Sequence, residues 1–86
     1  MLCDRYAKGS EAWVIAFAIE NDGGFEMPMG EMDGATVMSC RTLKQRHWIR
    51  FGTNNGVVEV SFTPSFQRII SNPEETDWME AVGWEE

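Results

Sequence analysis

Two short apolar runs on either side of an asparagine–glycine turn constrain the fold of this chain more than any other feature. In residues 47–52 and 57–62, apolar and polar side chains alternate, as they do in strands with one buried face. Asn55-Gly56 lies between the runs and suits the positive φ angles of a two-residue type I′ turn. The sequence therefore predicts a β-hairpin with one apolar face. The residues expected on that face are Ile49, Phe51, Val58, Val60 and Phe62.

The turn leaves two registers open. A loop at Asn55-Gly56 places Phe51 opposite Val60, whereas a loop at Asn54-Asn55 places Phe51 opposite Val58 and gains an opposite-charge pair. We favour the first loop because glycine takes a positive φ without steric cost. Both registers bury the same face of the hairpin.

Three further segments have the composition of strands. Bulky and small side chains alternate in residues 13–19, which predicts a central strand with two apolar faces. Residues 21–24 predict a reversal into a strand at residues 25–27. Residues 35–40 predict another strand, followed by a helical turn or a loop at residues 41–46.

Two segments that begin with proline predict short helices near the C-terminus. Thr63 and Asn72 each precede a proline, and a capping residue before proline is typical of a helix start. We expect helices at residues 64–70 and 73–83. The predicted fold is α+β: a small antiparallel sheet of four or five strands with two short helices at the C-terminus, in a single domain of residues 1–86.

Charge is segregated along the chain. Four of the seven cations lie between residues 41 and 50, whereas the last fourteen residues contain six carboxylates and no cation. The net charge of −7 argues against duplex-DNA binding, because cations supply most of the affinity for phosphates. The basic stretch includes Trp48, as in single-strand nucleic-acid platforms, but four cations are few. Pairing of this stretch with the acidic C-terminus, within one chain or across a homodimer, is the favoured alternative.

The N-terminus lacks the basic-then-apolar order of a signal peptide, and no apolar run approaches the roughly 18 residues of a membrane span. We therefore expect a cytoplasmic protein. Cys3 and Cys40 lack the spacing of a zinc site or a redox pair, which predicts free thiols.

No residue pattern identifies a catalytic site, a metal site or a cofactor. Cys40 and His47 are the residue types of a nucleophile pair, but no motif surrounds either of them. Met27, Met29 and Met32 have the spacing of a soft-metal loop, yet packing or partner binding explains methionines more simply. We predict that the chain is not an enzyme and holds no metal or cofactor.

The expected function is protein binding by an inhibitor or regulator. The C-terminal segment interleaves tryptophans with carboxylates, and such a surface anchors through its aromatic rings while its charges select a basic partner. The partner is expected to be a larger protein or ribonucleoprotein with a basic surface, including a surface that binds nucleic acid. In size and charge alone, the chain resembles inhibitors encoded by phages or mobile elements, anti-CRISPR proteins among them. The predicted partner-binding residues are Met27, Met29, Glu74, Glu75, Asp77, Glu80, Trp84, Glu85 and Glu86.

Two alternatives from other functional classes stay open. The first is a structural or assembly protein that self-associates through strand edges and charge complementarity. The second, less favoured, is an enzyme or ligand-binding protein with a pocket around Cys40, His47 and Trp48.

Overall fold

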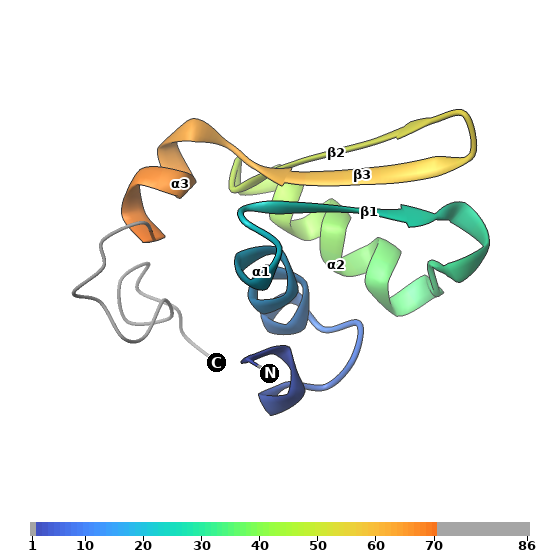
Figure 1. Cartoon of the computed structure of the whole chain (residues 1–86), viewed down its shortest axis with the longest axis horizontal. Helices are drawn as coiled ribbons and strands as arrows, with labels where there is room; N and C mark the ends of the chain where they lie inside the picture. The colour runs from blue at the N-terminus through green and yellow to red at the C-terminus, as the bar shows by residue number, and fades with distance from the viewer. Residues whose placement is uncertain (1, 71–86) are drawn as a thin grey trace.

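A computed structural model describes residues 2–70 of the chain (Figure 1). The predicted α+β class is confirmed, but the helices interleave with the strands instead of following them. The helix expected at residues 73–83 lies outside the described residues. In chain order the elements are the 3-10 helix η1 (Leu2–Arg5), α1 (Glu11–Glu20), β1 (Gly24–Pro28), the 3-10 helix η2 (Met29–Glu31), α2 (Gly34–Gln45), β2 (Ile49–Asn54), β3 (Val57–Phe62) and α3 (Pro64–Ile70).

The sheet in the described part of the chain has three antiparallel strands in the order β1-β3-β2. The expectation of four or five strands is therefore wrong for these residues. The predicted hairpin is confirmed, because β2 and β3 are joined by Asn55 at φ 52° and Gly56 at φ 78°. Phe51 lies opposite Val60, which confirms the register favoured by the Asn55-Gly56 turn. The helix predicted at residues 64–70 is also confirmed, as α3.

Residues 13–19, which were expected to form a strand, belong to α1. The helix begins after Ser10, whose Oγ accepts a hydrogen bond from the Trp13 backbone N–H at 3.2 Å. Six of its ten residues are buried, including five successive ones at residues 12–16. A helix buried on nearly every side has no polar face to reveal its period of 3.6 residues. The alternation of bulky and small residues was therefore not evidence for a strand.

Residues 35–40, also expected to form a strand, make the first half of α2. The helix continues through the expected turn or loop as far as Gln45. Asp33 caps it: its Oδ1 accepts a hydrogen bond from the Thr36 backbone N–H at 2.8 Å, and the hydrogen bonds from Thr36 lower the pKa of Asp33. Thr36, Cys40 and Leu43 are buried at helical spacing, which overrides the strand preference of individual residues.

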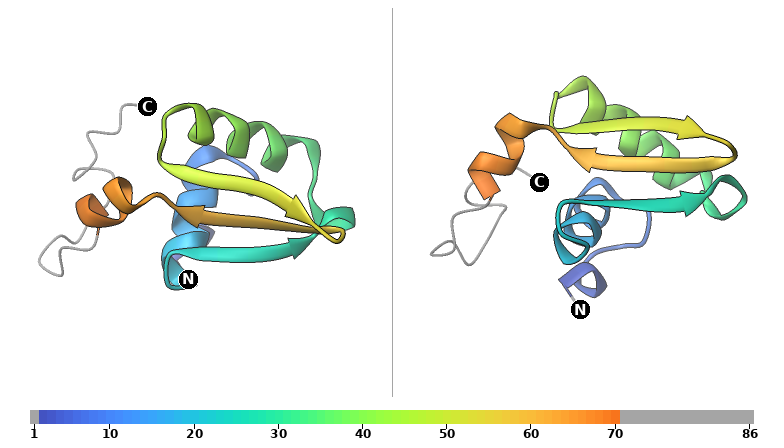
Figure 2. Two further views of the ribbon diagram at one scale, coloured as in Figure 1. Left: turned by 90° about the horizontal axis from the view of Figure 1, so that it is seen from above. Right: turned by 45° about the horizontal axis from the view of Figure 1, so that its top comes forward.

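The helices α1 and α2 lie on one face of the sheet (Figure 1). α1 packs against β1 and β3, and α2 packs against β2, so the core lies between these helices and the sheet. No element of the described part covers the opposite face (Figure 2). α3 projects beyond the end of β3 and is anchored by Phe66. None of the helices in residues 2–70 is long and apolar enough to cross a membrane.

Candidate docking surface

The face of the sheet opposite the helices carries charged and small side chains. Phe25, Ile49 and Val60 are buried toward the helices, so their neighbours along each strand point the other way. We call this surface the outer sheet face. Its central residues are Gly24, Glu26, Arg50, Gly52, Glu59 and Ser61.

Two glutamates meet on the outer sheet face, because Glu26 of β1 lies directly opposite Glu59 of β3. The Phe62 N–H donates to the Gly23 carbonyl at 2.9 Å. Hydrogen-bonded and non-hydrogen-bonded pairs alternate along an antiparallel ladder, so Glu26 and Glu59, three pairs further along, form a non-hydrogen-bonded pair. Cβ atoms in such pairs lie about 4.5–5.5 Å apart. Both side chains are exposed, and within residues 2–70 neither forms an ion pair. Like charges at this distance oppose pairing of the strands instead of supporting it.

The outer sheet face also contains two strand glycines, and the fold requires glycine at only one of these two positions. A Cβ at Gly24 would lie 2.7 Å from the Val60 carbonyl oxygen, so the close approach of β1 to β3 requires glycine there. A Cβ at Gly52 would meet nothing within 4 Å, and Gly52 does not have a positive φ. Gly52 lies opposite Glu59, so one cross-strand row reads Glu26, Glu59, Gly52.

Of the predicted partner-binding residues, the structure describes Met27 and Met29. Those from Glu74 to Glu86 lie outside the described residues. Met27 is half-buried and packs against the core, which leaves it little surface to offer. Met29 is 50% exposed at the end of β1, where its N–H donates to the Gly56 carbonyl at 2.9 Å. Met29 therefore lies beside the hairpin turn as an exposed apolar group.

The basic stretch does not form one surface. Arg41 and Lys44 lie on α2, whereas Arg50 lies on the outer sheet face. The Arg46 guanidinium lies 5.1 Å from the centroid of the Trp48 ring, and Trp48 also stacks on Phe66 at a centroid distance of 4.9 Å. These two contacts use the ring faces on which a nucleic-acid base would have to stack. The geometry therefore gives Trp48 a packing role.

Each free edge of the described sheet carries one group that opposes pairing with another strand. The last residue of β1 is Pro28, which has no N–H to donate. At the other edge, the Lys44 Nζ donates to the Phe51 carbonyl of β2 at 3.4 Å. Proline and lysine at edges are established devices against edge-to-edge association. These two groups therefore count against assembly through strand pairing at the described edges.

The two thiols have the environments of structural cysteines. Cys40 is fully buried, and burial raises its pKa to about 11. No hydrogen bond joins it to His47, which is exposed after the end of α2. Cys3 donates from Sγ to Glu20 Oε2 at 3.3 Å, and burial followed by this hydrogen bond raises its pKa. Both thiols are free and stay protonated at neutral pH, unlike an activated nucleophile.

Cys40 should make the fold less stable in alkaline solution. Its pKa is about 11 in the folded protein and 9.0 as an unperturbed thiol, so the unfolded chain loses this proton first. The contribution of the protonated Cys40 thiol to the free energy of unfolding is complete below pH 9. It is lost as pH rises towards 11, which lowers the free energy of unfolding by about 1–3 kcal/mol. Urea denaturation at about pH 8 and about pH 10.5 should show a larger loss in wild type than in Cys40→Ala. Equal losses in the two proteins would contradict the assigned burial.

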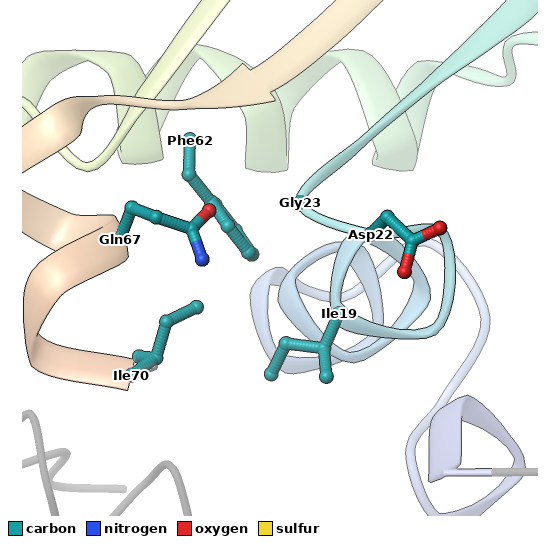
Figure 3. Close-up of a pocket in the computed structure, with 6 residues that line it drawn as sticks. All are labelled: Ile19, Asp22, Gly23, Phe62, Gln67 and Ile70. Atoms are coloured by element: carbon teal, nitrogen blue, oxygen red, sulfur yellow. The ribbon is translucent and has the colours of Figure 1, made fainter. Parts of the chain in front are cut away.

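A cleft of about 280 Å³ lies between the end of α1 and α3 (Figure 3). Three of its six lining residues have apolar side chains, and the Asp22 carboxylate points away from the Gln67 amide. Asp22 is the one titratable side chain among these described lining residues, so they contain no acid–base pair. Its lining residues are Ile19, Asp22, Gly23, Phe62, Gln67 and Ile70.

Neither a search for metal-ligand clusters in the described residues nor a comparison with known proteins identifies a further site. Within residues 2–70, no group of three or more histidine, cysteine, aspartate or glutamate side chains is placed to hold a metal ion. No family model, curated protein or solved structure matches the chain. The features from which a function can be argued are the outer sheet face and the acidic composition of residues 73–86.

Proposed function

We propose that this chain is a small acidic protein-binding module that inhibits or regulates a larger macromolecule by docking on its basic surface. The observation that carries the proposal is the distribution of charge. Residues 2–70 contain eight carboxylates and all seven cations, whereas residues 73–86 contain six carboxylates and no cation. Nearly all of the acidic excess therefore belongs to one short segment, which attracts cations within about 10 Å at 0.1 M salt.

The mechanism is competition for a basic groove. Carboxylates of residues 73–86 take the places of nucleic-acid phosphates against arginine and lysine side chains of the partner. Trp84 adds aromatic surface, and Met29, which is half exposed, adds an adaptable apolar contact. The partner is a cytoplasmic protein or ribonucleoprotein, and inhibitors carried by phages or mobile elements provide the analogy in size and charge.

An affinity pull-down from native host lysate tests this proposal. Wild type is compared with the charge-reversed variant Glu74→Lys/Glu75→Lys/Asp77→Lys/Glu80→Lys, with elution by rising salt and a nuclease-treated lysate as control. We expect one protein or ribonucleoprotein that wild type retains after nuclease treatment and the reversed variant loses. Equal retention by both proteins would contradict docking through these carboxylates, and so would binding that nuclease treatment abolishes.

A further inference from the structure

We infer that the outer sheet face binds an arginine-bearing segment of the basic partner, with one guanidinium held between Glu26 and Glu59. The inference rests on the proposed function and names the contact made by the folded part of the chain. It commits the surface to one occupant, a segment of a basic protein, on the grounds of charge, shape and area.

Charge complementarity is the first argument. Glu26 and Glu59 are adjacent, exposed and without an ion pair within residues 2–70. A cation between them converts their mutual repulsion into two attractions. A guanidinium suits the position better than an ammonium, because its planar fork of five donors can serve two carboxylates at once. A depression of about 340 Å³ next to the pair, bounded by Gly24 and Ser61, gives the arginine stem a place to lie.

The shape of the row is the second argument. Gly52 completes the cross-strand row, and the fold does not need glycine there because a Cβ would meet nothing within 4 Å. Glycine inside a strand lowers stability and often marks a bulge, a bend, or a site where a ligand or another backbone approaches closely. Beside Glu59 it leaves one flank of the carboxylate open. The row therefore combines a repulsive glutamate pair with a residue that weakens a strand. Neither feature helps the sheet to fold, whereas both suit the binding of a cationic segment.

Area is the third argument, and it separates a partner segment from a second copy of the chain. Three strands of five or six residues present a face of about 15 by 18 Å. A stable dimer buries about 800 Å² of accessible surface on each copy, which is more than a face of these dimensions offers. A single segment of a partner, by contrast, is small enough to lie on this face alone.

The test is an NMR titration of the full chain with a short capped peptide of alternating arginine and serine. The peptide with citrulline in place of arginine is the neutral control. We expect amide shifts at Gly24, Glu26, Arg50, Gly52, Glu59 and Ser61, and binding about three- to thirtyfold weaker in Glu26→Gln/Glu59→Gln. The charge-matched control Asp22→Asn/Glu31→Gln, off the outer sheet face, should bind like wild type. Gly52→Thr should weaken binding while its thermal denaturation shows a fold at least as stable as wild type.

Each other result overturns the inference in a recognisable way. Shifts confined to residues 73–86, or equal binding by wild type and Glu26→Gln/Glu59→Gln, would remove the outer sheet face and leave the proposed function standing. No binding by any form of the chain, together with a failed pull-down, would remove both. Dimers that sediment as such and dissociate in Glu26→Gln/Glu59→Gln would assign the face to a second copy instead.

Discussion

Replacing Phe66 with alanine should lower the free energy of unfolding by about 3–5 kcal/mol, the usual cost of deleting a buried aromatic side chain. Phe66 is 1% exposed and supplies the only buried side chain that α3 places in the core among the described residues. Its ring stacks on Trp48 at 4.9 Å and meets Phe62 at 5.0 Å. The substitution therefore removes the anchor of α3 and abolishes the ring contacts of Phe66 with Trp48 and Phe62.

Urea denaturation followed by tryptophan fluorescence measures this loss. Ile69→Ala is the matched control, because Ile69 lies in the same helix and is 45% exposed. It should change stability by no more than about 0.5 kcal/mol. A cost below about 1 kcal/mol for Phe66→Ala, or similar costs for both variants, would show that α3 is not packed as described.

The two glycines of the outer sheet face should respond to alanine with opposite signs. Gly24→Ala brings a Cβ to 2.7 Å from the Val60 carbonyl oxygen, so β1 has to move away from β3. We expect a loss of about 1–3 kcal/mol from this overpacking. Gly52→Ala has open space, and it should raise stability by up to about 1 kcal/mol because alanine restricts the unfolded chain.

Thermal and urea denaturation of the two variants, side by side with wild type, give both signs in one experiment. Each variant is a control for the other, because both substitutions add one methyl group to the same sheet, at a half-exposed and an exposed position. A destabilising Gly52→Ala would mean that the fold itself requires this glycine. That result would withdraw the second argument for binding at the Glu26, Glu59, Gly52 row.

The hairpin was predictable because its determinants are local. A two-residue turn demands positive φ at both positions, and Asn55-Gly56 meets that demand. The alternation on each side then fixes which face is buried, so fold and register followed from about sixteen consecutive residues. The start of α3 was equally local, since Pro64 follows Thr63.

α1 and α2 were missed because tertiary burial hid their periods. α1 is surrounded by the sheet, η1 and α2, so its residues are apolar on almost every side. Alternation of large and small residues then imitates a strand. The caps were the available signals: Ser10 and Asp33 each stand three residues before the N–H that they accept from.

The outer sheet face depends on a pairing that the sequence does not specify. Glu26 meets Glu59 only because β1 pairs with β3. These two strands are separated by 28 residues, which include α2 and β2. The methionine segment drew attention by its composition, yet Met27 is directed largely into the core. Nonlocal strand pairing, not residue type, therefore determines which carboxylates of the folded part stand together.

The most direct test of carboxylate-mediated docking is the salt dependence of affinity for the partner that the pull-down identifies. Affinity should fall by tenfold or more between about 50 and about 500 mM NaCl, because exposed charge pairs are screened over this range. The fall should be shallower in Glu26→Gln/Glu59→Gln, which has two fewer charges at the interface. An affinity that stays constant across this range, in wild type and variant alike, would contradict recognition of a basic surface by these carboxylates.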